Sequence, residues 1–326
     1  MTTPLVIDAN SLIKRMIMSS ALDDLKAGGV FTGGVYGMLN SLRAFLDTPE
    51  GHFCGPIIAL FDDGIPPRRL ELLPDYKSGR AERKKLLTDE EKKRAFEQMG
   101  IARKMLDLLG VLCLSYEDRE ADDAVGAVCR VFIEKKITPL VMTGDRDLWQ
   151  MVWRGARVYD LNKKRFIDDD NFLEVAGVES STYLLYKALV GDPSDSIVGC
   201  QGCGPKRAQA LLMEATENVA VFERLNPWQQ LATLKEMIEK RKKRKKFEEA
   251  LLDYYQYLRK VLEAIDLWTS FGGLKALRKR LKENRPTVRK MDFLRLCKKL
   301  NFQSVLGAPD KYARPFTTAA MSAQIG

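Results

Sequence analysis

Five short apolar runs divide the first half of the chain, and helical patterns fill the intervals between them. Residues 35–46 repeat apolar side chains at helical spacing, and residues 124–133 do the same. Strands that alternate with helices favour an α/β domain with a mainly parallel central sheet and flanking helices. The five expected strands cover residues 5–7, 57–61, 111–114, 139–142 and 158–161.

Acidic residues follow four of these strands at the point where each strand ends. The carboxyl ends of parallel strands lie along one edge of the sheet, where open α/β folds bind ligands, so we expect the acids to meet there. Glu120 and Asp123 share a helix face because they are three residues apart. Asp145 and Asp147 share a side of an extended segment. The acids at the four strand ends are Asp8, Asp62, Glu120, Asp122, Asp123, Asp145 and Asp147.

Such a concentration of carboxylates needs cations to balance it. The ligands are oxygens and the only histidine, His52, lies far from the later acids in the sequence, which favours Mg²⁺ or Mn²⁺ over zinc. Paired hard cations suit phosphodiester hydrolysis, because one ion activates water while both stabilise the scissile phosphate. Taken singly, Asp122 and Asp123 could cap a helix and Asp8 could lie in a turn. Capping does not explain four strand ends that all terminate in acids.

The net charge of +9 over 326 residues is unevenly spread, with basic runs at 235–246 and 275–299 and an acid-rich first half. A basic region beside an acidic cluster indicates nucleic acid held near bound metal, although each basic run alone also fits a solvated helix face. No apolar run has transmembrane length, so a cytoplasmic protein without a membrane partner is expected. The six cysteines are expected to be reduced, and Cys200 and Cys203 lack the second pair of a zinc site.

The character of the chain changes near residue 180, where strand patterns give way to helical ones. We therefore expect an α/β core over residues 1–180 and a helical region over 181–306. A charged insert at about 68–99 interrupts the core between the second and third strands. The small and polar residues 307–326 are expected to form a flexible tail.

Six motifs occur in one order along the chain: V-I-D-A-N, F-D, Y-K-S-G-R, E-A-D-D, T-G-D-R-D and G-D-P-S-D-S-I, the last followed by G-C-Q-G-C-G-P-K-R-A. With them the sequence resembles the flap endonuclease and 5′-3′ exonuclease family, comprising the 5′ nuclease domain of bacterial DNA polymerase I and its stand-alone phage relatives. The resemblance covers residues 4–215 strongly and weakens towards residue 306. It implies a nuclease core of the PIN-like kind.

The resemblance implies roles for individual residues. Lys77 and Arg80 would stabilise charge at the scissile phosphate. Arg69 would contact DNA, and Tyr76 would stack on a base near the cut. A solvated, charged helix face is the alternative for these four. The implied metal ligands, divided between two ions, are Asp8, Asp62, Glu120, Asp122, Asp123, Asp145, Asp147, Asp192 and Asp195.

Two further elements follow from the resemblance. The insert resembles the family's helical arch, through or beneath which a single strand passes. Residues 183–215 resemble its helix–two-turn–helix, where glycines let backbone amides approach a duplex phosphate. A potassium ion is plausible at this element, and a plain glycine-rich turn is the alternative. Its implied DNA-binding residues are Gly199, Gly202, Gly204, Lys206 and Arg207.

We therefore expect a hydrolase that cuts DNA near junctions of duplex and single strand, as a flap endonuclease and 5′-3′ exonuclease in replication or repair. It would use two Mg²⁺ ions, with Mn²⁺ as a substitute, and leave 5′-phosphates. The family also implies possible cutting of RNA–DNA hybrids, a monomer, a separate DNA polymerase as partner, and a bacterial or phage-infected cytoplasm.

Three alternative functions fit the sequence less well. A PIN-like ribonuclease would lack the insert and the glycine-rich element. A purely DNA-binding descendant would have lost acids of the metal site. A phosphatase of the Asp-x-Asp kind is excluded because Asp8 is followed by Ala9 and Asn10.

Overall fold

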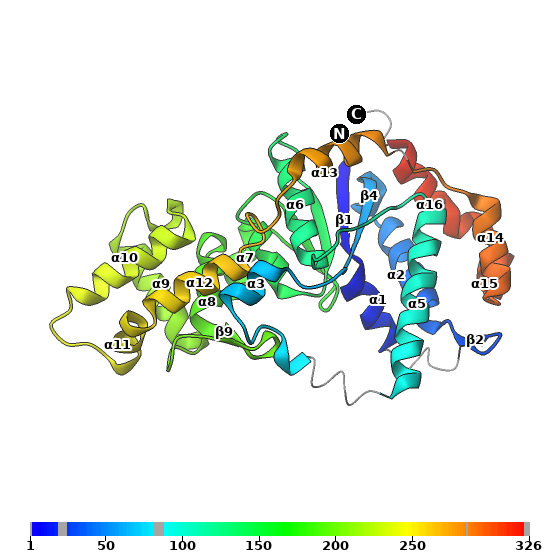
Figure 1. Ribbon diagram of the computed structural model, residues 1–326. Coiled ribbons are helices and arrows are strands. Elements are labelled where there is room, and N and C mark those ends of the chain that lie inside the picture. The colour runs from blue at the N-terminus through cyan, green and yellow to red at the C-terminus, as the bar shows by residue number, and fades with distance from the viewer. Residues whose placement is uncertain (1, 19–24, 81–87, 285, 323–326) are drawn as a thin grey trace.

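The computed structural model describes residues 2–18, 25–80, 88–284 and 286–322 and is built around one six-stranded sheet (Figure 1). Four neighbouring strand pairs are parallel, and the last strand, β8, pairs antiparallel with β7. This confirms the expected α/β fold with a mainly parallel sheet. In spatial order the strands are β5 (Leu112–Ser115), β4 (Cys54–Phe61), β1 (Thr3–Asp8), β6 (Leu140–Thr143), β7 (Arg157–Asp160) and β8 (Arg165–Ile167).

Alternate residues of the central strands belong to two different hydrophobic cores, one on each face of the sheet. Leu5 and Ile7 of β1 point into one core, whereas Val6 points into the other. Both faces are therefore covered, which explains why these strands read as continuous apolar runs. The helices of the Leu5 face are α1 (Ala9–Ile17), α2 (Gly33–Leu46), α5 (Asp89–Leu108), α14 (Lys290–Lys299), α15 (Gln303–Gly307) and α16 (Pro309–Ser322).

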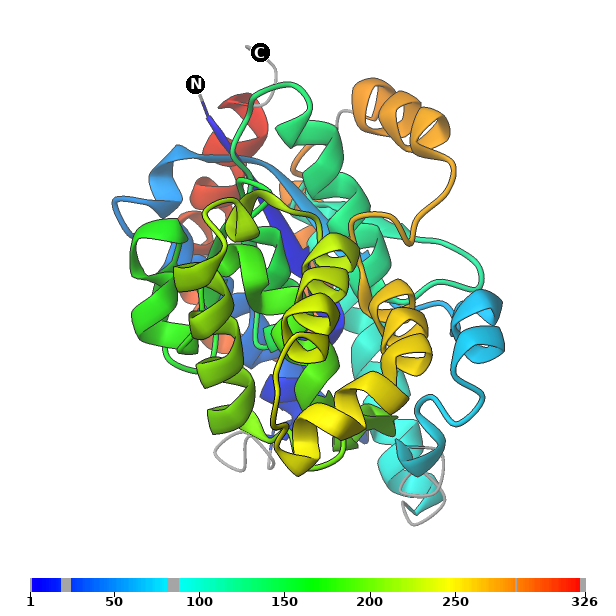
Figure 2. The same ribbon diagram turned by 90° about the vertical axis from the view of Figure 1, so that its left-hand side faces the viewer.

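The Val6 face is covered by α6 (Ala121–Ile133) and η3 (Arg146–Met151), and its core continues into the helical lobe, which we define as residues 169–265. In Figure 2 this lobe lies in front of the strands. The change of sequence pattern near residue 180 thus does not separate two cores. The helices of the lobe are α7 (Asp169–Ala176), η4 (Ser180–Thr182), α8 (Tyr183–Val190), α9 (Pro205–Asn218), η6 (Phe222–Arg224), α10 (Pro227–Glu239), α11 (Lys246–Asp253) and α12 (Tyr255–Ile265).

The C-terminal segment corrects one expectation. Residues 309–322, expected to belong to a flexible tail, form α16, which packs against β4 and α2. Tyr312, Phe316 and Ala319 are buried in the core of the Leu5 face because they recur at helical spacing. The final residues, 323–326, lie outside the described part of the chain.

The insert begins with α3 (Pro67–Leu72), which packs against α12 of the helical lobe, and ends in α5, whose start is fixed by a capping box between Thr88 and Glu91. Residues 81–87 lie outside the described residues, so the expected arch is described only at its two ends. The remaining elements are β2 (Lys26–Ala27), β3 (Val30–Phe31), η2 (Gly51–Phe53), β9 (Gly191–Asp192), η5 (Pro193–Asp195), β10 (Ile197–Val198) and α13 (Leu274–Glu283).

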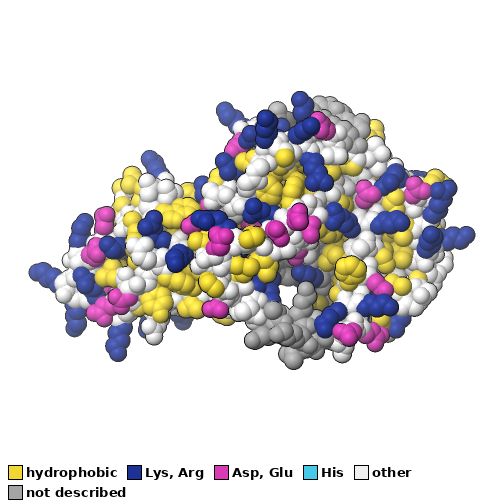
Figure 3. All heavy atoms as spheres, in the orientation of Figure 1, with side chains coloured by type: hydrophobic (Ala, Val, Ile, Leu, Met, Phe, Trp, Pro, Cys, Tyr) yellow, Lys and Arg dark blue, Asp and Glu magenta, His cyan; other side chains and the backbone are white. Residues whose placement is uncertain are grey.

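Lysine and arginine side chains gather over α13 and at the far end of the helical lobe, as Figure 3 shows for this face of the molecule. In the described residues, no helix has the length and apolar character that crossing a membrane requires.

Candidate active site

A cleft of about 480 Å³ opens at the carboxyl edge of the sheet and is lined by acids from several elements. Asp8 ends β1, Asp62 follows β4, and Asp145 follows β6. The structure therefore brings these acids together at the edge where a parallel sheet was expected to place them. The acids that line the cleft are Asp8, Asp62, Glu120, Asp122, Asp145, Asp147 and Asp192.

Asp8 is held rigidly at the centre of this edge. Its Oδ1 accepts a hydrogen bond from the Ser11 amide at 2.9 Å and so caps α1, and its Oδ2 accepts one from Thr143 Oγ1 at 2.9 Å. Burial raises the pKa of Asp8 to about 6, against the lowering effect of these two hydrogen bonds. The carboxylate thus has a fixed position in a buried setting that disfavours its charged form.

Asp62 is positioned by Asn10, the last residue of the V-I-D-A-N motif that also contains Asp8. Asn10 Nδ2 donates to Asp62 Oδ2 at 2.5 Å, and the Asp62 amide donates to Asn10 Oδ1 at 3.1 Å. The Ala121 amide, in the first turn of α6, donates to Asp62 Oδ1 at 2.9 Å. Asn10 was not selected from the sequence, although it stands in the V-I-D-A-N motif and that motif could have revealed it.

Asp122 and Asp145 carry the strongest signs of crowded negative charge. Burial, followed by the repulsion of Asp147, raises the pKa of Asp145 to about 7. Burial, followed by the charges of Asp145 and Asp8, raises the pKa of Asp122 well above its usual range. Buried acids that repel one another in this way form a site that a cation would stabilise.

Asp123 corrects a second expectation, because it does not line the cleft. Its side chain is 0% exposed, and its Oδ1 accepts from Arg69 Nη2 at 2.7 Å. Glu120, one helix turn away, accepts from the same guanidinium. The predicted shared face of Glu120 and Asp123 is therefore real, but it is directed at an arginine, and Asp123 is not placed to bind a metal ion.

Arg69 and Tyr76, expected to contact DNA, are instead buried beneath the cleft. Arg69 is 6% exposed and donates from Nε to the Ala264 carbonyl at 2.7 Å, which ties α3 to the end of α12. Tyr76 is 8% exposed, and its hydroxyl donates to Glu120 Oε2 at 2.9 Å. Neither side chain is placed to meet a nucleic acid, because both are occupied in fixing Glu120.

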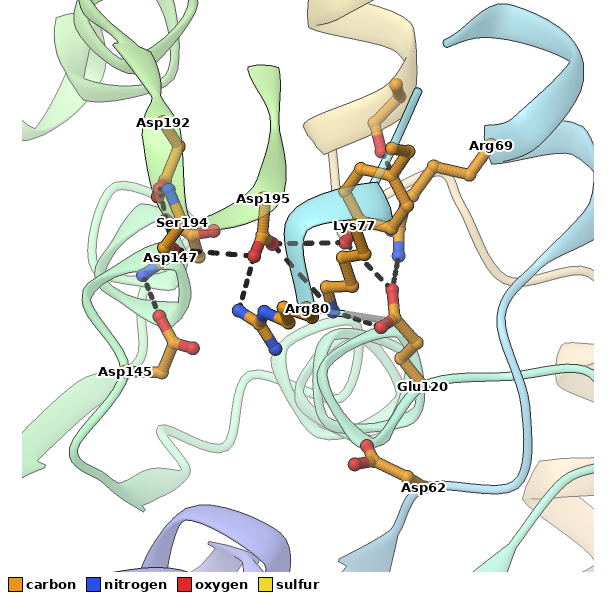
Figure 4. Close-up of polar contacts among 12 residues, drawn as sticks. Asp62, Arg69, Lys77, Arg80, Glu120, Asp145, Asp147, Asp192, Ser194 and Asp195 are labelled. Carbon is orange, nitrogen blue, oxygen red and sulfur yellow. Dashed lines mark hydrogen bonds and ion pairs between the residues drawn. The ribbon is translucent and has the colours of Figure 1, made fainter. Parts of the chain in front are cut away.

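Lys77 and Arg80 lie at the rim of the cleft, where both carry positive charge close to the acids. Lys77 is paired with Glu120, and its Nζ lies 3.8 Å from Asp195 Oδ2. Arg80 is paired with the same Asp195 (Figure 4). Burial raises the pKa of Asp195, although Lys77 and Arg80 act in the opposite direction. Asp195 is buried behind these cations and does not line the cleft, unlike Asp192.

A lysine missed by the sequence reasoning completes the far side of the cleft. Lys187 Nζ lies 2.8 Å from Asp147 Oδ1 and 3.1 Å from Asp192 Oδ2. Burial lowers the pKa of Lys187, but the nearby negative charges, Asp147 foremost, outweigh burial and hold the pKa above its usual range. The side chain therefore remains an ammonium ion. Lys187 belongs to no acidic motif, so only its position in space reveals it.

The turn between α8 and α9 is built from glycines with different requirements. A Cβ on Gly199 would lie 2.3 Å from the Val190 carbonyl, and Gly202 has a φ of +73°, so both need glycine for the fold. Gly204 is the N-cap of α9, and a Cβ there would meet no atom within 4 Å. Lys206 and Arg207 follow on the exposed surface, and Arg207 Nη1 donates to the Gly202 carbonyl at 2.7 Å.

The donor set of the cleft fits a hard divalent ion, since its acidic ligands are all carboxylates and burial has left several with raised pKa values. Across the described ranges, however, no three acidic, histidine or cysteine side chains already converge as a group that could hold an ion. Basic side chains stand against several of the acids instead, as Lys77 does with Glu120 and Lys187 with Asp147.

The fold and its edge define an α/β protein with a carboxylate-lined cleft at the carboxyl end of a mainly parallel sheet. Residues 3–177 match the family described as 5′-3′ exonuclease, N-terminal resolvase-like domain. The chain belongs to this 5′-3′ exonuclease family.

Two curated relatives illustrate the match. A 5′-3′ exonuclease of Bacillus subtilis is 30% identical over 218 residues, which cover 64% of this chain and 69% of that protein. DNA polymerase I of Streptococcus pneumoniae is 29% identical over 230 residues, which cover 68% of this chain. The chain spans only 25% of the length of that polymerase.

Solved structures agree on the fold. The crystal structure of the T5 D15 protein with metal ions superposes with a TM-score of 0.65 at 20% identity, covering 90% of this chain and 99% of that one. A complex of bacteriophage T5 D15 flap endonuclease with DNA and metal ions gives a TM-score of 0.64 at 19% identity, covering 92% and 99% of the two chains. These likenesses confirm the expected fold class.

Proposed function

We propose that this protein is a metal-dependent, structure-specific 5′ nuclease that hydrolyses DNA phosphodiesters near junctions of duplex and single strand. The observation that carries the proposal is the cleft itself, which is lined by seven carboxylates together with basic side chains that include Lys77 and Arg80. Membership of the 5′-3′ exonuclease family supports the same activity. Replication and repair are the processes in which such a nuclease acts.

The carboxylates of the cleft are proposed to hold two Mg²⁺ ions, for which Mn²⁺ can substitute. Asp8, Asp62, Glu120 and Asp122 would serve one side, and Asp145, Asp147 and Asp192 the other. When bound, such ions supply an activated water and stabilise the charge on the phosphate. Asp195 would contribute by holding Lys77 and Arg80, because it is buried behind them.

Lys77 and Arg80 are proposed to stabilise the negative charge that develops on the scissile phosphate. Arg80 is half-exposed, with 44% of its side chain accessible, so it can exchange its partner Asp195 for a phosphate. Fixed cations near a low-dielectric cleft act more strongly than cations in water, and they cost little reorganisation during the reaction. Hydrolysis would leave a 5′-phosphate on the product.

Duplex DNA is proposed to lie against the turn between α8 and α9. Gly204 leaves open space at the N-terminus of the 14-residue helix α9, where backbone amides favour a phosphate. Lys206 and Arg207 add exposed positive charge. In the run 240–246, Arg241 is paired with Glu214 and Glu248, so this arginine serves the fold, while the exposed lysines of the run remain candidates for phosphate contacts.

The resemblance to the flap endonuclease and 5′-3′ exonuclease family supports several more detailed predictions. They are combined endonuclease and 5′-3′ exonuclease activity, removal of RNA from RNA–DNA hybrids, a potassium ion at the helix–two-turn–helix, a monomer, a separate DNA polymerase as partner, and action in the cytoplasm. Each stays a prediction with its own assay.

Cleavage of a 5′-labelled flap DNA and a matched linear duplex, each with Mg²⁺ or EDTA, tests the function. We expect Mg²⁺-dependent cutting near the flap junction, and the linear duplex measures the accompanying exonuclease activity. Absence of cutting of both DNAs, with binding intact, would contradict the proposal. The same assay on single-stranded RNA would then test a PIN-like ribonuclease, and failure there would leave a DNA-binding role.

A further inference from the structure

Lys187 occupies the space between two acids that are proposed to hold a metal ion. Its Nζ lies 2.8 Å from Asp147 Oδ1 and 3.1 Å from Asp192 Oδ2, and its side chain is 19% exposed. All three residues line the cleft. A single ammonium ion thus already bridges two carboxylates from different parts of the chain, Asp147 in η3 and Asp192 in β9.

The other cations of the cleft have different partners. Lys14 Nζ lies 3.4 Å from Asp62 Oδ2, on the opposite side, Lys77 is paired with Glu120 and Asp195, and Arg80 is paired with Asp195. Arg146, which also lines the cleft, has its Cζ 5.4 Å from the centre of the Trp149 ring. Among the ion pairs of the described residues, Lys187 is the cation that faces Asp147 and Asp192. A divalent ion placed between these two acids would meet the full charge of this ammonium, because the partly buried position limits screening by solvent.

We propose that Lys187 is an internal cation that stands in for the second divalent ion between Asp147 and Asp192, so that this ion binds weakly until the ammonium withdraws. This inference rests on the proposed function, since it deepens the account of the same cleft. The first ion, proposed to be held by Asp8, Asp62, Glu120 and Asp122, is not in competition with Lys187.

DNA provides a reason for the ammonium to withdraw. Lys187 has a flexible four-carbon stem, and a backbone phosphate in the cleft would offer it an alternative anionic partner. Lys187 also lies in the last turn of α8, four residues before Gly191, so it is part of the element proposed to meet the duplex. Binding of DNA and binding of the second ion are therefore expected to favour each other, as linked equilibria require.

The test is a Mn²⁺ titration of the metal-free, full-length protein without DNA, in which electron paramagnetic resonance measures free Mn²⁺. Wild type is expected to bind one ion tightly and a second weakly. Lys187→Met is expected to bind the second ion roughly tenfold or more tightly, because one opposing charge near the ion has been removed. Lys187→Arg keeps the charge and is expected to behave as wild type.

Lys14→Met is the matched control, because it removes the same charge from the other side of the same cleft. It is expected to leave the weak second site unchanged. Lys187→Gln carries the same prediction as Lys187→Met, with a side chain that still forms hydrogen bonds to the acids, so a folding defect in one variant does not end the test. Thermal melting in EDTA verifies that each variant is folded.

An unchanged second site in folded Lys187→Met and Lys187→Gln would overturn the inference, as would equal tightening in Lys14→Met. Cleavage of flap DNA by the wild-type protein tests the proposed function separately. If wild type cuts flap DNA and the second site does not respond to Lys187, only the inference about Lys187 is wrong.

Discussion

Arg69 pairs with two buried carboxylates at once, Glu120 and Asp123, and also donates to the Ala264 carbonyl. A buried ion pair of this kind adds little net stability to the fold. Breaking it is nevertheless costly, because removing the cation leaves buried negative charge unpaired. Arg80 differs, since it is half-exposed and its partner Asp195 keeps Lys77 as a second cation. At the scale of residues, a structural arginine therefore lies beneath the cleft and another arginine lies at its rim, and the sequence motif alone does not distinguish the two.

Replacing each arginine by methionine should separate the two kinds. Arg69→Met is expected to lower the free energy of unfolding by roughly 3–5 kcal/mol, since it leaves a buried charge without its partner. Arg80→Met is expected to lower it by about 1 kcal/mol or less, because Arg80 is half-exposed and its partner Asp195 keeps Lys77 nearby. Urea denaturation in EDTA measures both. Equal losses in the two variants would contradict the distinction between buried and rim arginines.

The turn between α8 and α9 contains glycines that the fold requires and one glycine that leaves room for a phosphate to approach. Gly199 touches the backbone of the preceding helix, where a methyl group would overlap the Val190 carbonyl. Gly204 stands free at the start of α9 with a φ of −71°, which any residue adopts. At the scale of elements, glycine is therefore required for packing at Gly199, whereas at Gly204 it leaves space for a phosphate to approach the helix.

Alanine substitutions should reveal this difference. Gly199→Ala is expected to destabilise the protein by roughly 1–3 kcal/mol through overpacking. Gly204→Ala is expected to change stability by about 1 kcal/mol or less, but to weaken binding of duplex DNA roughly three- to tenfold by obstructing one phosphate contact. Thermal melting and fluorescence anisotropy in Ca²⁺ measure the two effects. Unchanged DNA binding in Gly204→Ala would remove this glycine from the duplex contact.

The elements that could be predicted from the sequence are those in which most consecutive residues are apolar and buried. The strand β4 is almost wholly apolar because both faces of the sheet are covered, so it was found. The edge strand β8 has three residues, of which one is buried, and it was missed. The helix α16 was missed because alanines and threonines obscured Tyr312, Phe316 and Ala319, whose spacing does carry a helical signal.

The residues of the site likewise fall into those that could be predicted from the sequence and those that could not. The acids at strand ends could be predicted, because a parallel sheet brings its carboxyl ends together whatever else the chain does. The partners of those acids could not, because Arg69 and Tyr76 lie in the insert and Lys187 in a helix of the lobe. Whether an arginine faces a buried acid or solvent depends on how α3 packs against α12, which no local pattern specifies.

At the scale of the whole molecule, the sheet separates two cores, and the C-terminal helix closes one of them. Phe316 of α16 is 1% exposed and packs in the core that contains Leu5, Ile7 and α2. The basic α13, by contrast, contributes Leu277 to the opposite core. The chain beyond residue 274 thus covers both sides of the sheet, so this C-terminal segment serves the nuclease core as well as the surface charge.

Shortening one side chain of α16 tests this role. Phe316→Ala is expected to lower the free energy of unfolding by roughly 3–5 kcal/mol, the usual cost of a large cavity in a core. Met321→Ala, in the same helix but 62% exposed, is expected to change it by about 0.5 kcal/mol or less. Denaturant titration measures both. A small effect of Phe316→Ala would mean that the segment does not pack as a helix.

The carboxylates of the cleft are proposed to hold the divalent ions on which hydrolysis of DNA depends. Asp145→Asn tests this assignment without unfolding the protein. Burial and Asp147 raise the pKa of Asp145 from 3.8 to about 7, so this group costs stability progressively as the pH rises between these two values, and the cost is complete above the higher one. At pH 8 in EDTA the variant is therefore expected to be at least as stable as wild type.

Single-turnover cleavage of a 5′-flap DNA in Mg²⁺ at pH 8, with binding measured in Ca²⁺, is the most direct measurement. We predict that Asp145→Asn binds the flap as wild type does but cuts it roughly a hundredfold more slowly or worse, since several kcal/mol of transition-state stabilisation are lost. Cleavage at the wild-type rate would contradict the assignment of this cleft as the catalytic metal site.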